Sequence, residues 1–374
     1  MLDISLIMLA AGNSSRFNLG VKKQFIRLGG LPLWLYATKN LSSFYPFKKI
    51  IVTSSNTSHM QKFIHHNEKY EFVKGGDTRM QSLKNALDLV TSEFVMVSDV
   101  ARVLVSKELF ENLIENINNA DCITPALKVA DTTLLEDEVV AREKIKLIQT
   151  PQLSRVSLLK KALAQNIEFS DDSTAIASVG GKIWFIKGEE KTHKITFDED
   201  LKKLDLPPPS SEIFTGNGFD VHEFGEKRSL ILGGVKVHES MGLKAHSDGD
   251  VLAHSLTDSL LGAASLGDIG EHFPDTDKAY KNADSMKLLK KAYDLVKEYG
   301  FELVNADITI IAQTPRLKDF KDKIACNIAS VLNVENFRIN IKATTTEKLG
   351  FIGRKEGIGV LSSVNLKYFD WMKI

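Results

Sequence analysis

Three consecutive prolines, Pro207, Pro208 and Pro209, divide the 374-residue chain into two parts. Each proline fixes φ and lacks a backbone N–H, so the run should form an extended spacer outside any helix or sheet. Each flanking part has the length of an ordinary domain, which is about 100–200 residues. We therefore predict one domain at residues 1–205, a linker at 206–212 and a second domain at 213–374.

The charge balance of the chain argues against nucleic acid or a membrane surface as its binding partner. Lysine and arginine total 48, as do aspartate and glutamate, so there is no basic excess for nucleic acid or a membrane surface. No apolar run approaches the roughly 18 residues of a membrane span. The apolar stretch at 4–11 follows Asp3 instead of the positive charges of a signal peptide. Cys122 and Cys326 are too few for a disulfide framework or a cysteine zinc site, and we expect the chain to work in the cytoplasm.

Short apolar runs alternate with helical patterns before the prolines. This alternation predicts an α/β domain with an open, mostly parallel sheet, in which ligands bind beyond the carboxyl ends of the strands. Longer strands mixed with a few helices follow the prolines, which predicts an α+β or mixed α/β domain. Strands are expected at 5–10, 49–54, 94–98, 122–125, 213–222, 304–312, 338–343 and 359–368, and helices at 33–44, 59–67, 80–90, 250–264 and 285–300.

A glycine-bearing turn, Ala10-Ala11-Gly12, ends the first predicted strand and precedes Arg16 and Lys23. Small residues let backbone N–H groups approach phosphate oxygens, and the two cations add positive charge. A plain turn between a strand and a helix is the alternative. The chain has no Walker A sequence.

Two later strand ends carry further polar groups. Gly76 precedes Arg79 and Ser82, and Asp99 ends a buried run. A carboxylate in that position suits Mg²⁺, which prefers one or two carboxylates together with phosphate oxygens. Taken alone, Asp99 fits a helix cap better than a metal ligand.

These pieces resemble, in their order, the methylerythritol-phosphate cytidylyltransferase family over almost all of residues 1–201. The matching runs are Ala10-Ala11-Gly12, Arg16, Lys23-Gln24, Gly75-Gly76-Asp77 with Arg79 and Ser82, Asp99-Val100-Ala101-Arg102, Asp131-Thr132, Thr150-Pro151-Gln152, Asp171 to Ala175, and Lys194-Ile195-Thr196. The resemblance implies a Rossmann-like nucleotidyltransferase domain that joins CTP to methylerythritol phosphate.

The resemblance also implies roles for the matching residues. Arg16, Lys23 and Lys194 would act in catalysis by holding the CTP phosphates, and Asp99 would serve the nucleotide and a Mg²⁺ or Mn²⁺ ion. Thr132 and Arg142 would hold the phosphate of the sugar alcohol. Further substrate contacts would come from Ala10, Ala11, Gly12, Gly76, Arg79, Ser82 and Arg102. The chain departs from the family pattern at Val21-Lys22, Ser98, Val100 and Val103.

These residue types suit cytidylyl transfer. A phosphate monoester is already anionic at neutral pH, because its second pKa is about 6, and it needs no general base to attack. The site has to align the reactants and place positive charge around the phosphorus as pyrophosphate leaves.

A metal-ligand pattern occurs in the second part. Asp220 and His222 lie two apart on a predicted strand and therefore face the same side. Asp250, His254 and Asp258 are spaced by four on a predicted helix and share a face. Two imidazoles and a carboxylate are a common ligand set for catalytic zinc. An isolated Asp-x-His is also common without any metal.

A polar loop runs from Lys342 to Arg354 after another predicted strand. Its hydroxyls, glycines, arginine and carboxylate suit a metal-bridged diphosphate, and an ordinary polar loop is the alternative.

Together these runs resemble the methylerythritol cyclodiphosphate synthase family over residues 214–369. The matches are Gly218 to His222, Ala245 to Asp250, His254, Thr257-Asp258, Leu260 to Gly270, Phe273 to Asp277, Ile310 to Gln313 with Pro315, and Lys342 to Gly353. The resemblance implies an α+β domain in which Asp220, His222 and His254 bind zinc, and Glu347 binds Mg²⁺ or Mn²⁺. Thr345 would be catalytic, and substrate contacts would come from His246, Ser247, Asp268, Asp277, Ala312, Pro315, Arg316, Leu317, Thr344, Phe351 and Arg354.

The second implied reaction is intramolecular. The 2-phosphate of phosphorylated CDP-methylerythritol attacks the β-phosphorus of its own CDP group, a cyclodiphosphate forms and CMP leaves. The resemblance further implies a trimer, or a multiple of three, with sites shared between neighbouring subunits. Because a kinase acts between the two reactions, association with that kinase is also expected.

Two alternatives to a bifunctional enzyme of isoprenoid-precursor synthesis remain open. The first domain could be a non-catalytic scaffold on a working synthase, since it carries the departures, or it could serve another sugar and nucleotide. The presence of Arg16, Lys23 and Lys194 favours two activities.

Overall fold

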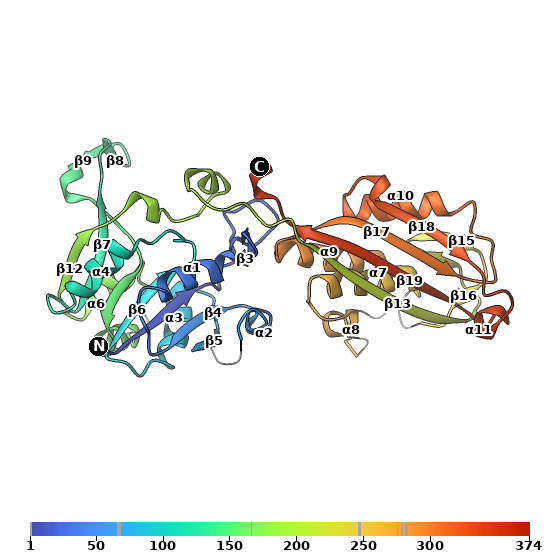
Figure 1. The fold of residues 1–374 in the computed structure, drawn as a ribbon, viewed down its shortest axis with the longest axis horizontal. Coiled ribbons are helices and arrows are strands. Elements are labelled where there is room, and N and C mark those ends of the chain that lie inside the picture. The colour runs from blue at the N-terminus through green and yellow to red at the C-terminus, as the bar shows by residue number, and fades with distance from the viewer. Residues whose placement is uncertain are drawn as a thin grey trace. The chain divides into compact units, whose positions relative to one another are not determined.

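Two compact units make up the chain in this computed structural model, one ending at Pro208 and the other comprising Pro209–Lys373. The structure describes residues 2–65, 69–165, 167–245, 248–274, 276–277, 280 and 283–374. Each unit has its own sheet and its own helices (Figure 1). Within these ranges, no helix combines the length and apolar composition needed to cross a membrane.

The first unit is built on eight described strands in the order β10-β7-β11-β6-β1-β4-β5, with β12 beside β7. The β1–β4, β1–β6, β4–β5 and β7–β12 pairs are parallel, whereas β10 and β11 run antiparallel to their neighbours. The predicted α/β domain with a mostly parallel sheet is thus confirmed. The strands are β1 (Ile4–Leu9), β4 (Ile50–Ser54), β5 (Tyr70–Lys74), β6 (Phe94–Asp99), β7 (Cys122–Lys128), β10 (Lys146–Ile148), β11 (Gln152–Arg155) and β12 (Ile183–Lys187).

Register in this sheet explains where polar residues meet. Strands β1 and β6 are parallel, with Leu9 opposite Asp99, so the turn after β1 and the carboxylate ending β6 reach the same edge. Buried Ile7 and Val97 on these strands pack in one core with Leu83 of α3. The helices are α1 (Leu33–Ser42), α2 (Thr57–Gln61), α3 (Arg79–Leu87), α4 (Lys107–Glu115), α5 (Val156–Leu163) and α6 (Asp172–Ser178).

The bounds predicted for the helix at 59–67 are wrong. Helix α2 begins at Thr57, because the side chain of Asn56 accepts a hydrogen bond from the backbone of His59 and caps the helix there. The helix ends at Gln61, and residues 66–67 of the prediction lie outside the described residues.

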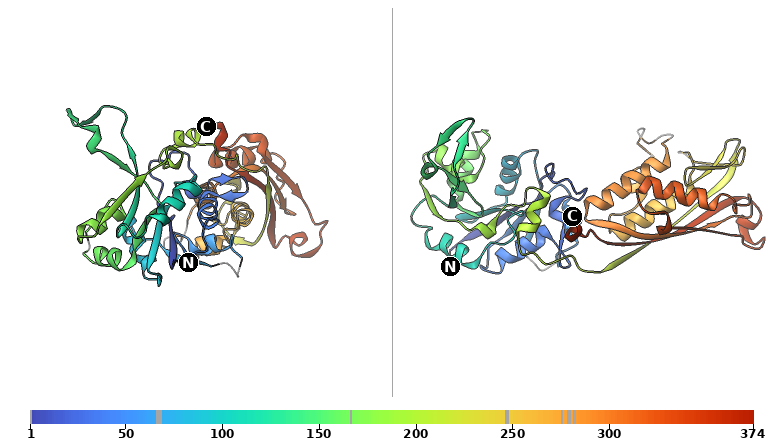
Figure 2. Two further views of the ribbon diagram at one scale, coloured as in Figure 1. Left: turned by 60° about the vertical axis from the view of Figure 1, so that its left-hand side comes forward. Right: turned by 90° about the horizontal axis from the view of Figure 1, so that it is seen from above.

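A hairpin of β8 (Thr133–Leu135) and β9 (Glu138–Val140) projects from the first unit (Figures 1 and 2). Leu134, Leu135 and Val139 are exposed on it. A second small pair, β2 (Arg27–Leu28) and β3 (Leu31–Pro32), precedes α1.

The second unit has a mixed sheet in the order β16-β13-β19-β17-β18. Strands β13, β19 and β17 are antiparallel to one another, and β18 is parallel to β17. The strands are β13 (Ile213–Glu226), β16 (Gly242–Leu243), β17 (Phe301–Ile311), β18 (Ile339–Thr344) and β19 (Gly357–Tyr368), with a separate pair of β14 (Leu230–Leu232) and β15 (Val235–His238). The helices are α7 (Val251–Ala263), α8 (Ile269–His272), α9 (Ser285–Glu298), α10 (Lys321–Leu332) and α11 (Gly350–Gly353).

Helices cover one face of this sheet (Figure 2). Along β13, residues facing α7 are buried or partly buried, such as Gly218 and Asp220, while Phe219 and Val221 between them are exposed. This period-two alternation places Asp220 and His222 on the helix-covered side, as the sequence predicts. The α+β arrangement of this unit confirms the predicted fold class.

Two candidate active sites

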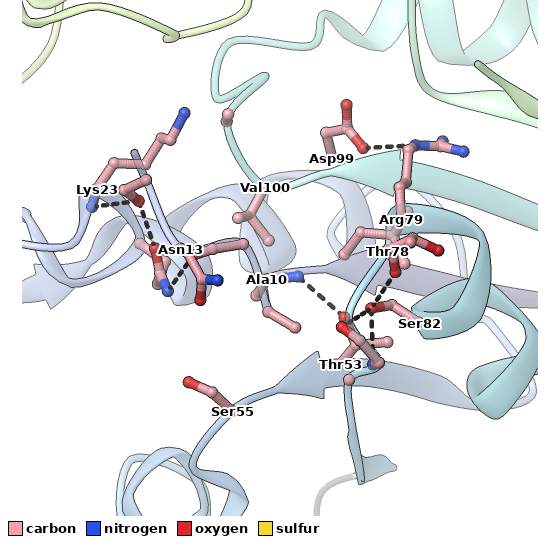
Figure 3. A pocket seen from close by; sticks show the side chains of 18 of the residues that line it. Ala10, Asn13, Lys23, Thr53, Ser55, Thr78, Arg79, Ser82, Asp99 and Val100 are labelled. Carbon is pink, nitrogen blue, oxygen red and sulfur yellow. Dashed lines mark hydrogen bonds and ion pairs between the residues drawn. The ribbon is translucent and has the colours of Figure 1, made fainter. Parts of the chain in front are cut away.

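The first cavity lies beyond the carboxyl ends of β1, β4 and β6 and has a volume of about 470 Å³. This is the edge at which open α/β sheets bind ligands. The predicted residues that line it are Ala10, Ala11, Gly12, Arg16, Lys23, Gly76, Arg79, Ser82, Asp99 and Lys194. Figure 3 shows Lys23 on one side of the cavity and the Asp99–Arg79 pair on the other.

Hydrogen bonds shape the turn after β1. Ala10 N donates to Thr53 Oγ1 over 3.1 Å. Buried Gln24 donates to Gly12 O over 3.1 Å and accepts from Ser14 Oγ over 3.2 Å. Gln24 therefore supports the turn while its neighbour Lys23 faces the cavity. The predicted site set lacks Gln24, although Gln24 follows Lys23 in one of the matching runs.

Gly75 lets a second loop close on this turn. A Cβ at Gly75 would lie 2.2 Å from the Cβ of Ala11, which is closer than any real contact. Gly76 N then donates to Ser82 Oγ over 3.0 Å. The predicted site set lacks Gly75, although Gly75 belongs to one of the matching runs, because a close approach between distant loops cannot be read from sequence.

Asp99 is an ion-paired carboxylate instead of a helix cap. Its carboxylate lies 3.3 Å from Arg79 Nε and also pairs with Lys194 Nζ. Burial opposes ionisation, but the charges of Arg79 and Lys194 outweigh it and lower the pKa of Asp99 to about 2. Arg79 also reaches Asp172 Oδ1, at 2.9 Å, and so is fixed between two carboxylates. The predicted site set lacks Asp172.

Positive charge dominates the cavity wall. Arg16, Lys23, Lys74, Arg79 and Lys194 line it. Asp77 and Asp99 are the only carboxylates among its described lining residues. The lining cations repel one another at short range, and a negatively charged ligand between them would relieve that repulsion. The excess of positive charge therefore favours a polyanionic ligand such as a triphosphate.

The ammonium of Lys23 is strongly perturbed. Its Nζ donates to Ile195 O over 2.9 Å. Burial, together with the charges of Lys194 and Arg16, lowers the pKa of Lys23 to about 8. Lys22 does not line the cavity, so of the two adjacent lysines the structure places Lys23 at the cavity wall.

We expect cytidylyl transfer to weaken at alkaline pH because of Lys23. The group is charged below its pKa of about 8 and loses its charge as the pH rises through that value. Bound triphosphate stabilises the charged form, so the loss should appear in kcat/KM for CTP, which reports the free enzyme, more than in kcat. A pH profile of pyrophosphate release measures this, and Lys23→Arg should move the alkaline limb to higher pH. An alkaline limb that Lys23→Arg leaves in place would contradict the assignment.

Three predicted residues of this unit do not line the cavity. Arg102 donates to Thr192 O over 2.8 Å and to Ile148 O over 3.3 Å, which secures the segment leading to Lys194. Thr132 and Arg142 are exposed near the projecting hairpin, where Arg142 donates to Ala130 O over 2.7 Å. Their predicted contact with the sugar phosphate stays a prediction.

The second cavity, of about 900 Å³, contains the predicted zinc ligands. Asp220 and His222 come from β13 and His254 comes from α7, and their ligand atoms lie within 4.8 Å of one another. Asp220 Oδ2 is 3.3 Å from His222 Nδ1 and 3.3 Å from His254 Nδ1. Asp258 and the predicted substrate residue Asp277 also line the cavity.

The donor set fits a divalent cation. Asp220 Oδ2 and His222 Nδ1 are buried and make no hydrogen bond of good geometry to any described residue. Despite burial, the neighbouring histidines hold the pKa of Asp220 well below its usual range, so it is ionised. Converging lone pairs from one carboxylate and two imidazoles, with an open cavity beside them, match a catalytic zinc site.

Gly218 brings α7 close enough for His254 to complete this set. A Cβ at Gly218 would lie 2.0 Å from the backbone oxygen of Ser255 on α7. Ser255 Oγ also donates to Gly218 O over 3.0 Å. A side chain at this strand position is therefore incompatible with the observed approach of the helix.

We expect Gly218→Ala to destabilise the second unit by about 1–3 kcal/mol, because the added methyl group would force β13 and α7 apart. The displaced His254 should also weaken metal binding. Gly262→Ala on α7 is the matched control, because a Cβ there meets nothing within 4 Å. Thermal unfolding and zinc titration measure both effects. Equal behaviour of the two variants would show that the close approach is unimportant.

Neighbouring acidic residues have structural roles. Buried Asp250 caps α7 and accepts hydrogen bonds from the backbone of Gly233 and Gly234, so it does not join the metal ligands. Asp268 caps α8 and is exposed beside the cavity without lining it. The predicted substrate residues His246 and Ser247 lie outside the described residues.

The remaining predicted residues lie at the end of β18 and in the segments that follow β17 and β18, including α11. Ala312 N donates to Thr344 O over 3.0 Å, which joins the two segments. Thr345 Oγ1 donates to Glu347 Oε1 over 2.8 Å, and Glu347 has a φ of 51°. The members that do not line the cavity beside the zinc ligands are Ala312, Pro315, Arg316, Leu317, Thr344, Thr345, Glu347, Phe351 and Arg354. Among the described residues of one chain, the cavity beside the predicted zinc ligands is thus lined without any member of this group.

Comparison with known proteins decides between the alternatives. Residues 4–206 match the family model of 2-C-methyl-D-erythritol 4-phosphate cytidylyltransferase, and residues 213–367 match that of the YgbB family. The bifunctional enzyme IspD/IspF of Campylobacter jejuni subsp. jejuni is 73% identical over 374 residues, covering 100% of both chains. The chain belongs to the bifunctional IspD/IspF family.

Other members of this family agree. The bifunctional IspD/IspF of Campylobacter lari is 71% identical over 374 residues, again covering 100% of both chains. A solved structure of the bifunctional IspDF from Campylobacter jejuni has a TM-score of 0.95 and 73% identity, and covers 99% of this chain and 100% of that chain. Membership of the bifunctional IspD/IspF family means that the chain carries a cytidylyltransferase and a cyclodiphosphate synthase. This result favours two activities over a synthase with a non-catalytic scaffold.

Proposed function

We propose that the first cavity transfers CMP from CTP to 2-C-methyl-D-erythritol 4-phosphate, and that the second converts phosphorylated CDP-methylerythritol into 2-C-methyl-D-erythritol 2,4-cyclodiphosphate. The observation that carries this proposal is that each unit has its own cavity with its own arrangement of charges, cationic in the first and metal-binding in the second. The proposed domains are residues 1–205 and 213–374, joined by a linker at 206–212.

In the first reaction, the site aligns the two substrates and neutralises negative charge on the phosphates. Arg16, Lys23 and Lys194 surround the phosphates and neutralise the charge that develops as pyrophosphate leaves. The attacking monoester is an anion and requires no base. The low pKa of Asp99 keeps this carboxylate ionised, so that it can hold Lys194 and bind Mg²⁺ or Mn²⁺, which when bound supplies charge to the triphosphate.

In the second reaction, the two phosphates of one substrate have to meet. Asp220, His222 and His254 would hold Zn²⁺, which when bound supplies a Lewis acid for a phosphate oxygen. Glu347 would hold a second divalent ion. Thr345, whose hydroxyl donates a hydrogen bond to the Glu347 carboxylate, would assist at the diphosphate. The residues predicted to surround the cytidine lie at the ends of β17 and β18.

An oligomer would reconcile these two groups of residues. We propose a trimer, or a multiple of three, in which the β17–β18 ends of one chain face the metal cavity of a neighbour. The exposed cross-strand pair of Phe219 and Leu361, with exposed fractions of 59% and 46%, provides apolar surface for such an assembly.

Association with the intervening kinase is also proposed. The free cysteines Cys122 and Cys326 fit the reducing cytoplasm, where we place both reactions.

One purified sample tests the whole proposal. Zinc per chain is quantified, pyrophosphate release is measured with CTP and methylerythritol phosphate, and CMP release is measured with phosphorylated CDP-methylerythritol. We expect about one zinc per chain, matching the one ligand triad among the described residues, and both products. Zinc and CMP without pyrophosphate would mean that the first cavity serves another substrate.

A further inference from the structure

His254 is held from both sides of its ring. Nδ1 faces the metal-ligand set and lies 3.3 Å from Asp220 Oδ2. Nε2 lies 3.0 Å from Ser285 Oγ, and Ser285 Oγ donates to Asp248 Oδ1 over 2.5 Å. A chain of hydrogen bonds therefore runs from Asp248 through Ser285 to the histidine.

Which group donates and which accepts in these hydrogen bonds follows from the number of protons available. Both oxygens of Asp248 act as acceptors, because Oδ2 accepts from Ser285 N over 3.1 Å and Oδ1 also accepts from Asp250 N over 3.3 Å. A hydroxyl has a single proton, and Ser285 gives it to Asp248. Ser285 Oγ can then only accept from His254, so Nε2 carries the ring proton and Nδ1 keeps its lone pair.

We propose that Ser285 and Asp248 are positioning residues that fix the tautomer and ring orientation of His254 for metal binding. The inference rests on the proposed metal site and extends it to two residues that do not touch the metal. A hydrogen bond to the second nitrogen of a ligating histidine fixes its tautomer and raises its basicity. With the opposite tautomer, His254 would point an N–H at the cation and could not bind it.

Packing makes this arrangement rigid. Ser285 is buried, with 1% of its surface exposed, and it is the first residue of α9. His254 is on α7, so the hydrogen bond between them joins two helices. Ser285→Ala leaves the backbone bond from Ser285 N to Asp248 intact, so α9 should still begin at the same place.

The test is zinc affinity of the full-length chain, measured by competition with a chromophoric chelator. We expect Ser285→Ala to bind zinc about 10-fold to 100-fold more weakly. Ser285→Thr should restore most of the affinity, because it retains the hydroxyl. Ser259→Ala is the matched control, since Ser259 is a fully buried serine on α7. Its hydroxyl donates to Leu256 O over 2.8 Å, within its own helix and away from the candidate metal ligands.

Two further measurements separate positioning from a general structural role. The visible absorption of the Co²⁺-substituted chain should change in Ser285→Ala and not in Ser259→Ala. Because Ser285 and Asp248 act in series, the Ser285→Ala/Asp248→Asn double variant should lose little more affinity than the weaker-binding single variant.

Two results would overturn the inference in distinguishable ways. Unchanged zinc affinity and an unchanged Co²⁺ spectrum in Ser285→Ala would show that the hydrogen-bond chain does not position His254. Zinc binding by the unaltered chain that is no tighter than that of Asp220→Asn would show that the ligand triad is not a metal site, and the proposed function would fail with it.

Discussion

Asp220→Asn is expected to reduce CMP release from phosphorylated CDP-methylerythritol by at least about 100-fold, because even residues behind the ligands affect metal sites by about 10-fold to 100-fold. Asp220 is the shared neighbour of both histidines, at 3.3 Å from each. Asparagine has the same shape but lacks the charge that a divalent cation requires. Zinc content should fall together with CMP release.

Pyrophosphate release by the same Asp220→Asn sample should be unchanged, since the first cavity lies in the other compact unit. The control is Asp307→Asn, which removes a partly exposed carboxylate from β17 and its ion pair with Lys342. Such exposed pairs contribute at most about 1 kcal/mol, so both activities should persist. Loss of both activities in Asp220→Asn would refute the independence of the two sites.

Lys23→Ala should reduce kcat/KM for CTP by about 100-fold to 1,000-fold, which is the typical effect of removing one preorganised donor from developing negative charge. Lys23 is a cavity lysine whose pKa is lowered to about 8 by burial and by the neighbouring charges of Lys194 and Arg16. Its removal takes positive charge from the phosphates without leaving a buried carboxylate unpaired, because Lys23 Nζ donates to a backbone oxygen.

Lys22→Ala is the matched control for this experiment. The two lysines are adjacent in sequence, but only Lys23 lines the cavity. Pyrophosphate release from CTP and methylerythritol phosphate should therefore be close to normal in Lys22→Ala, and CMP release should be normal in both variants. A larger loss of pyrophosphate release in Lys22→Ala than in Lys23→Ala would show that the phosphate-binding role belongs to Lys22 and not to Lys23.

Short-range patterns were sufficient for several features. The spacing of Asp220 and His222 on one strand predicts that both face the same side, and β13 has this alternation. The buried run ending at Asp99 predicts a strand with a carboxylate at its end, and β6 ends there. These features depend only on backbone periodicity, which sequence expresses directly.

Long-range contacts were not predictable in the same way. Gln24 supports the turn at Gly12, and Gly75 lies against Ala11, across separations that no local pattern encodes. Strands β5, β10, β11 and β12 were also not predicted, since short strands gain much of their stability from neighbours. The same limit applies to Ser285, whose role depends on a helix that begins far from His254 in sequence.

The sequence alone determined the two-part organisation, the residue types of both chemistries and the family. It did so because prolines, charged motifs and strand periodicity are local properties of the chain. Only the tertiary structure decided which of two adjacent lysines lines the first cavity, and that Asp250 caps a helix while Asp220 joins the candidate metal ligands. These outcomes depend on where separate strands and helices come to lie, because a side chain's charge and role are set by the neighbours that packing places around it.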